Sequence, residues 1–86
     1  LRDPIQIGYD YELYMSIDTG RDRFSVKLKD GDTSINMPRE LKTIWGTNDA
    51  DDLKTWLKDN YADKMKGGLD YWFKQIDDFV DVITNN

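Results

Sequence analysis

The sequence contains neither cysteine nor histidine among its 86 residues. Without cysteine the chain has no disulfide framework and no thiolate metal site, so we expect it in a reducing compartment, the cytoplasm. Without histidine it lacks the residue that most often moves protons at neutral pH and activates nucleophiles. These absences remove most enzyme classes, and we expect a protein that is not an enzyme and uses no cofactor.

Long apolar runs and an excess of basic charge are also absent. No stretch of about 18 apolar residues is available to span a membrane, and the N-terminus lacks the pattern of a signal peptide. The chain has 12 basic and 17 acidic residues, a net charge of −5. Because non-specific affinity for nucleic acid comes from basic residues on phosphates, this balance argues against general polyanion binding and favours cationic partners.

Aromatic residues are abundant at 13% of the chain, and they include Trp45, Trp56 and Trp72. Such side chains each bury a large area, which is how a small domain without disulfides offsets its chain entropy. We therefore expect residues 1–86 to form a single domain with an aromatic-rich core. Residues 1–10 are expected to be an extended or frayed N-terminal segment.

Alternating apolar residues predict β-strands in the first half of the chain. Every odd position from Ile5 to Ile17 is apolar or aromatic, which is the period of a half-buried strand. Gly8 is typical of a bend or bulge, so the well-paired part is expected at residues 11–17. Residues 24–29 alternate in the same way and predict a second strand.

The dipeptide Asp30–Gly31 predicts the turn into a third strand. A two-residue type I′ turn needs positive φ at both positions, and Asp-Gly is among the pairs that supply it. Folding the chain there places Val26 opposite Ile35. It also places Phe24 opposite Met37, so the apolar faces coincide as a one-sided sheet requires. We therefore predict three antiparallel strands.

A short helix is predicted directly after the strands. Pro38 cannot continue a central strand, but it suits the first turn of a helix because its missing N–H is not needed there. Residues 39–45 are favourable for a helix, and Gly46 is a typical terminator.

Two longer amphipathic helices are predicted next. Thr47 or Asn48 is expected to cap the first of them, and Gly67–Gly68 ends it. The second, from about residue 69 to residue 83, has a wide apolar stripe. The sequence thus predicts an α+β fold: a three-stranded antiparallel sheet followed by a short helix and two amphipathic helices packed on one face.

Fragments that resemble catalytic motifs lack the required context. Glu40 and Lys42 have the carboxylate-x-lysine order of many metal-dependent nucleases, but they stand at a predicted helix start rather than on a strand. The three serines, Ser16, Ser25 and Ser34, lie in or beside strands, and none has the Gly-x-Ser-x-Gly surroundings of a nucleophile elbow. We predict no catalytic residue.

A calcium loop is the other alternative, because oxygen-bearing side chains alternate over residues 30–36. An EF-hand loop requires glycine at its sixth position and a bidentate glutamate at its twelfth. Counting from Asp30, these positions hold Ile35 and Leu41. Strand alternation explains the spacing better, and we predict no metal site.

The acidic residues are mostly aspartate, fifteen of 17, although glutamate is the better helix former. The acidic face predicted on the two long helices, flanking the apolar seam, consists of Asp52, Asp59, Asp63, Asp70, Tyr71, Asp77, Asp78 and Asp81. At a rise of about 1.5 Å per residue, Asp77 and Asp81 lie about 6 Å apart along the axis, similar to successive phosphates. Such rows are able to imitate a polyanion, whereas the alternative is an ordinary solvated surface.

A basic face is predicted on the other side of the molecule. It consists of Arg21, Arg23, Lys27 and Lys29, with Arg39 and Lys42 as extensions. Three-stranded sheets can insert into a major groove and contact bases through such residues. This face is therefore the basis of an alternative function.

We expect a small acidic non-catalytic domain that binds a protein with a basic surface, as an inhibitor that occupies the groove of a nucleic-acid-binding protein. The alternative is a DNA- or RNA-binding module that uses the basic sheet face, and a third possibility is a structural or assembly domain. No small-molecule ligand or membrane is implied. In size, acidity and layout the chain resembles the small accessory proteins of phages and mobile elements, some of which block nucleic-acid-handling enzymes, although no motif in it is specific to them.

Overall fold

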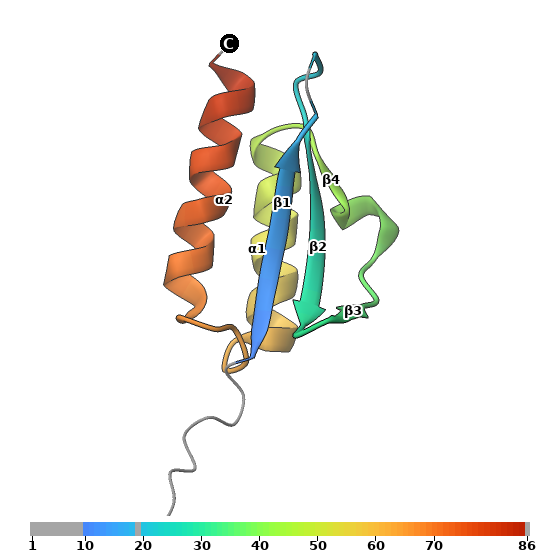
Figure 1. Ribbon diagram of the computed structural model, residues 1–86. Coiled ribbons are helices and arrows are strands. Elements are labelled where there is room, and N and C mark those ends of the chain that lie inside the picture. The colour runs from blue at the N-terminus through green and yellow to red at the C-terminus, as the bar shows by residue number, and fades with distance from the viewer. Residues whose placement is uncertain (1–9, 19, 86) are drawn as a thin grey trace, which may run out of the picture.

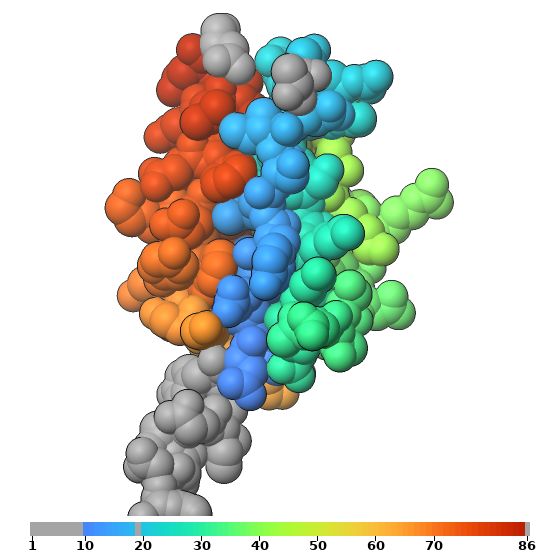
Figure 2. All heavy atoms as spheres, in the orientation of Figure 1, coloured from blue at the N-terminus to red at the C-terminus, as the bar shows by residue number. Residues whose placement is uncertain are grey.

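The computed structural model describes residues 10–18 and 20–85. In chain order they form β1 (Tyr11–Ile17), β2 (Phe24–Asp30), β3 (Thr33–Ile35), a 3-10 turn (Arg39–Leu41), β4 (Thr43–Ile44), α1 (Thr47–Tyr61) and α2 (Leu69–Thr84). The strands form one antiparallel sheet in which β1, β3 and β4 all pair with β2. In Figure 1, α1 lies behind this sheet and α2 stands beside β1, and the space-filling view in Figure 2 shows the other face of the sheet uncovered. The predicted α+β fold is confirmed, whereas the expected strand over residues 5–9 lies outside the described residues.

β1 and β2 pair along their whole length, from Tyr11 opposite Asp30 to Ile17 opposite Phe24. Along β2 the apolar side chains are buried and the side chains between them point outward, which confirms the predicted alternation. One face of the sheet therefore packs on the helices and the other meets solvent.

The turn between β2 and β3 lies one residue later than predicted. Asp30 still belongs to β2 and pairs with Thr33, so Gly31 and Asp32 are the two turn residues. Gly31 has φ of 63°, and no described residue other than glycine has positive φ. Positive φ at the first turn position alone is typical of a type II′ turn, not of the type I′ turn that the sequence predicted.

This turn changes the predicted register by two residues. Ile35 lies opposite Leu28 instead of Val26. The partner of Phe24 is in β4, and it is not Met37. Because side chains alternate with a period of two, a shift of two residues leaves the same side chains on the buried face.

Residues 39–45 do not form the predicted short helix. A single 3-10 turn is followed by β4, which pairs with the beginning of β2. Pro38 has no N–H to extend β3, so the chain leaves the sheet there and returns to it. On its return, the N–H of Val26 donates a hydrogen bond to the carbonyl of Lys42 at 2.9 Å. The third strand is thus interrupted, and β3 and β4 share one edge of β2.

The first long helix begins differently from the prediction. The N-cap of α1 is Gly46, which makes no side-chain cap, so the expected cap at Thr47 or Asn48 is wrong. Instead, the carboxylate of Asp49 accepts a hydrogen bond at 2.9 Å from the N–H of Trp45, just before the helix. This bond holds the chain as it enters α1.

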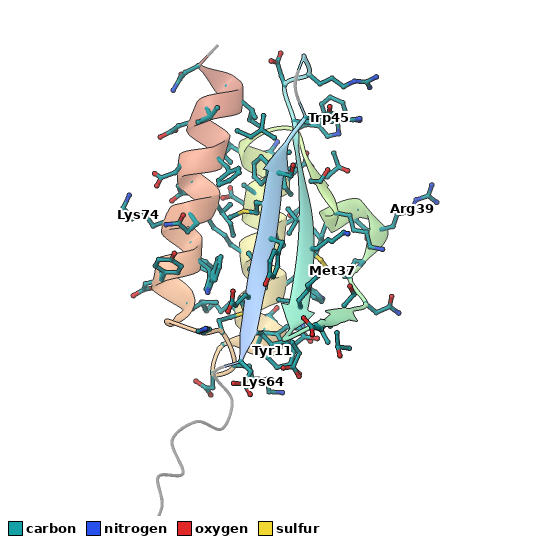
Figure 3. The ribbon with its side chains drawn as sticks, viewed as in Figure 1. Tyr11, Met37, Arg39, Trp45, Lys64 and Lys74 are labelled. Carbon is teal, nitrogen blue, oxygen red and sulfur yellow. The ribbon has the colours of Figure 1, made fainter. Side chains whose placement is uncertain are left out.

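The connection between the two helices is attached to the start of β1. The N–H of Tyr11 donates to the carbonyl of Lys64 at 3.0 Å, and the N–H of Lys66 donates to the carbonyl of Tyr11 at 2.8 Å. Figure 3 shows Tyr11 and Lys64 side by side at the lower end of the molecule. Met65 between them is fully buried, and the indole N–H of Trp72 donates to the carbonyl of Lys66 at 2.7 Å. Because the connection is attached to β1, α1 ends at Tyr61, before the end at Gly67–Gly68 that the sequence predicted.

The core lies between the sheet and the helices. Its fully buried side chains come from every layer and include Phe24, Ile44, Leu53, Leu57 and Ile76. The three tryptophans differ: Trp72 is buried, Trp56 packs at the edge of the core and Trp45 is 53% exposed. Phe24 and Trp72 are the only aromatic residues among the buried core residues described, so the core is mainly aliphatic and the expectation of an aromatic-rich core is wrong.

The turn geometry can be tested with two glycine substitutions. Gly31→Ala forces a side chain into the left-handed region, so we expect the free energy of unfolding to fall by about 1–2 kcal/mol. Gly46→Ala is the matched control, because Gly46 has φ of −179° and an added Cβ meets nothing within 4 Å. Urea denaturation of both variants measures the difference, and equal losses would contradict the described turn.

Candidate binding surfaces

The predicted aspartates of the two helices all lie on the surface, but they do not form one face. Lys54 of α1 forms an ion pair with Asp77 and lies 5.7 Å from the Phe73 ring, so this side of α1 faces α2. At about 100° per residue, Asp52 and Asp59 lie roughly 160° and 140° around α1 from Lys54. They therefore point away from α2.

Asp63, the third aspartate predicted on the first long helix, does not lie in a helix. Asp63 follows the end of α1, in the turn that leads to Met65. On α2, by contrast, Asp70 and Asp81 lie within roughly 40° of Asp77 around the helix. The structure therefore keeps the α2 row together and disperses the α1 row.

Two of the α2 carboxylates have lysine partners. Asp77 pairs with Lys54, and Asp78 pairs with Lys74 at 3.2 Å. The carboxylate side chains are 57% and 53% exposed, and exposed pairs contribute only about 0–1 kcal/mol. Such pairs are exchanged at little cost for the cations of a partner.

Exposed apolar side chains accompany the acidic row on α2. Tyr71 is 51% exposed and Val82 is 49% exposed, so both project away from the apolar stripe. Tyr71, Asp78 and Val82 lie within roughly 40° of one another around the helix. On the neighbouring β1, Ile17 is 38% exposed.

The outer sheet face carries a second candidate surface. Tyr14 lies opposite Lys27 in the ladder, is 49% exposed, and has the Lys29 Nζ 5.0 Å from its ring centroid. Two adjoining hollows of about 340 and 420 Å³ lie along this face. Besides Tyr14, their polar side chains are Ser16, Ser25, Lys27, Lys29, Ser34, Lys42 and Thr43. We call this set the lysine strip; no carboxylate among the described residues lines either hollow.

Carboxylates gather instead at one end of the sheet. A hollow of about 500 Å³ there is lined by Asp10, Glu12 and Asp30 together with Lys29 and Tyr14. The Tyr14 ring therefore borders an acidic hollow on one side and the lysine strip on the other. Any anion that binds this face is expected beside β2, away from that end.

The predicted arginines are separate from the lysine strip. Arg23 contacts the Asp18 carboxylate at 2.7 Å through Nη2 and at 2.8 Å through Nε, and its guanidinium lies 5.0 Å from the Trp45 ring centroid. Arg21 lies 3.9 Å from the same carboxylate. Both arginines thus belong to the turn between β1 and β2. Arg39 projects into solvent at the edge of the molecule away from α2 (Figure 3).

The chain matches no protein-family model, and comparisons with curated proteins and with solved structures found no match. Within the part of the chain that the structure describes, no group of three acidic side chains is arranged to hold a metal ion, and none of the helices is long and apolar enough to cross a membrane.

One titratable group is perturbed by its surroundings. Burial, and secondarily the neighbouring Tyr11, raises the pKa of Tyr61 above its usual value of 10.0. The two rings lie 5.1 Å apart beside the attachment of the helix connection. This tyrosine therefore stays a neutral, packed side chain at physiological pH.

The exposed ring of Tyr14 is a surface feature that was not among the predicted site residues. The odd positions of β1 are apolar or aromatic. Its even positions are polar, except that Tyr14 is aromatic. An aromatic residue on the polar side of an amphipathic strand is a signal for an exposed ring. The position of Lys42 beside β2, in contrast, depends on the return of the chain through β4.

The role of Arg23 can be tested by removing its side chain. Arg23→Ala eliminates both the contact with Asp18 and the packing on Trp45, and we expect a loss of about 1 kcal/mol in the free energy of unfolding. Arg21→Ala should cost less than about 0.5 kcal/mol because its contact is long and exposed. Chemical denaturation followed by tryptophan fluorescence compares them, and a neutral Arg23→Ala would show that the cluster contributes nothing.

Proposed function

We propose that this protein is a non-catalytic protein-binding domain that engages a basic partner through the exposed side of α2. In this proposal it acts as an inhibitor, and the α2 carboxylates take the place of phosphates in the groove of a nucleic-acid-binding protein. The observation that supports it most is the row of Asp70, Asp77 and Asp81 beside the exposed ring of Tyr71. Interfaces commonly combine such aromatic contacts with a charged rim.

The distribution of charge favours this side of the molecule. Residues 47–85 contain nine aspartates and five lysines, a net charge of −4, whereas residues 10–46 contain seven acidic and six basic residues, a net charge of −1. Nearly all of the excess negative charge is therefore on the helical layer. Such a field accelerates the encounter with a basic surface.

The geometry of α2 suits a linear array of cations. With a rise of about 1.5 Å per residue, Asp77 and Asp81 are about 6 Å apart along the axis, and Asp70 is about 10 Å before Asp77. A helix keeps these intervals rigid, so the carboxylates need little ordering when a partner binds. We therefore propose that only the carboxylates of α2 imitate a polyanion. Asp52, Asp59 and Asp63 do not take part in this proposal.

A charge-removal variant of α2 tests this proposal. It carries Asp70→Asn, Asp78→Asn and Asp81→Asn, and it leaves the Lys54–Asp77 pair intact. We expect binding to a basic partner to weaken at least about tenfold, since the removed charges contact it directly. Affinity chromatography identifies the retained protein from the host, and calorimetry with that purified protein measures the dissociation constant.

The matched control carries Asp52→Asn, Asp59→Asn and Asp63→Asn, which changes the net charge equally on the other side of α1. We expect less than about a threefold effect from it. Duplex DNA should also compete with the protein for its partner. Equal losses in the two variants, or a partner that DNA does not displace, would refute the proposal.

A second candidate function rests on the lysine strip. Single-stranded nucleic acids bind sheets on which aromatic rings stack with bases and basic residues contact phosphates. Tyr14 supplies such a ring, and Lys27, Lys29 and Lys42 supply the cations. A strip without carboxylates is notable in a chain of net charge −5. We therefore retain nucleic-acid binding as the alternative.

A salt titration with a fluorescent oligothymidine tests this alternative. Three lysines on phosphates predict a slope of about −2 in the logarithm of affinity against the logarithm of salt concentration. Tyr14→Ala should cost about 1–3 kcal/mol of binding if its ring stacks on a base. The control pair Lys58→Ala and Lys64→Ala should change nothing, and absence of binding at low salt would eliminate the alternative.

A further inference from the structure

β1 has one edge that the sheet does not use. The N–H and C=O groups of Tyr11 bond to the helix connection, so they point away from β2. Backbone groups of an antiparallel strand alternate in direction, and those of Leu13, Met15 and Ile17 therefore point to the same edge. Within residues 10–18 and 20–85, these three residues make no backbone hydrogen bond on that side.

The helical layer is wider than the sheet at this edge. In Figure 1, α1 lies behind β1 and β2, whereas α2 stands beside β1 on the side away from β2, and in Figure 2 the atoms of β1 border those of α2 directly. Ile17 is in phase with the buried Leu13, yet it is 38% exposed. Tyr71 and Val82 on α2 are about half exposed. Within the described residues, no strand pairs with β1 on the side next to α2.

We propose that an extended segment of the protein partner pairs with β1 along this edge and becomes a strand of the sheet. Its backbone bonds to Leu13, Met15 and Ile17, and its inward side chains cover Tyr71 and Val82. Addition of a strand to an exposed sheet edge is a common form of peptide recognition. The proposal rests on the protein-binding function above and specifies how the partner binds.

The chemistry of the partner segment follows from the surroundings of the edge. Its inward side chains are apolar because they meet Tyr71 and Val82. The segment carries a net positive charge, with its basic side chains at the outward positions that solvent reaches, because the helical layer has a net charge of −4. A second copy of this chain would bring the same negative charge to the edge. From Leu13 to Ile17 the edge spans about 13 Å, which matches a strand of about five residues.

Another hollow extends this edge at its lower end. It has a volume of about 270 Å³ and is lined by Glu12, Lys66, Gly67, Tyr71 and Trp72. Glu12 and Lys66 pair across it at 3.2 Å. In this proposal, the partner residue that follows the paired strand places its side chain in this hollow. A basic side chain at that position would replace Lys66 as the partner of Glu12.

Amide hydrogen exchange tests the edge in the free protein. The N–H groups of Leu13, Met15 and Ile17 should exchange quickly, because they point outward. Those of Tyr14 and Ser16 should be protected, because they face β2. Slow exchange of the first three in the free protein would show that this chain or a second copy already occupies the edge, and it would overturn the proposal.

The probe for binding is a peptide of alternating valine and lysine, and its control has prolines in place of two central valines. With the alternating peptide we expect the amides of Leu13, Met15 and Ile17 to exchange at least about tenfold more slowly. The proline peptide has the same charge but cannot continue a main-chain ladder, so it should leave them unchanged. Absence of protection at this edge overturns strand addition.

A substitution on α2 separates this proposal from the acidic interaction. Val82→Lys places a charge where the added strand would lie, and it should weaken the peptide at least about fivefold. Thr55→Lys on the outer side of α1 changes the net charge equally and should alter affinity by less than about twofold. If the peptide instead binds only through Asp70, Asp78 and Asp81, strand addition fails and the protein-binding function stands.

Discussion

Two backbone hydrogen bonds between Tyr11 and the helix connection determine how the layers of this domain are placed. They bring Lys64 and Lys66 to the start of β1 and bury Met65 completely between them. The Trp72 indole then closes the connection from the first turns of α2. Because the connection is held at the lower end of β1, α2 has to begin beside that strand and run along its outer edge.

This placement separates the surface into parts with different chemistry. The helical layer carries nearly all the excess negative charge, whereas the outer sheet face presents Tyr14 and the lysine strip. Between them lies the outer edge of β1, whose backbone groups from Leu13 to Ile17 bond to no described residue, and α2 with its half-exposed Tyr71 and Val82 stands beside it. A partner that adds a strand there would contact the α2 carboxylates as well, so one binding event uses both features.

Much of the fold could be predicted from local pattern. Alternation in β1 and β2 and the apolar stripe of α2 identified these elements nearly to the residue, because each periodicity is required to bury one face. The errors lie where neighbouring elements compete with local preference. The type I′ turn was wrong because pairing of Asp30 with Thr33 extends β2, and the helix over residues 39–45 was wrong because β4 gains hydrogen bonds from the free edge of β2.

The sequence by itself determined which residues are charged, where β1, β2 and α2 form and which of their side chains face the core, since these depend on composition and period. It could not determine that Asp52 and Asp59 point away from α2, because the rotation of one helix relative to another is set by their packing. The unused edge of β1 is also invisible in the pattern, since alternation describes the faces of a strand and not its edges. Only the tertiary structure decided that α2 stands beside the edge of β1 that faces away from β2.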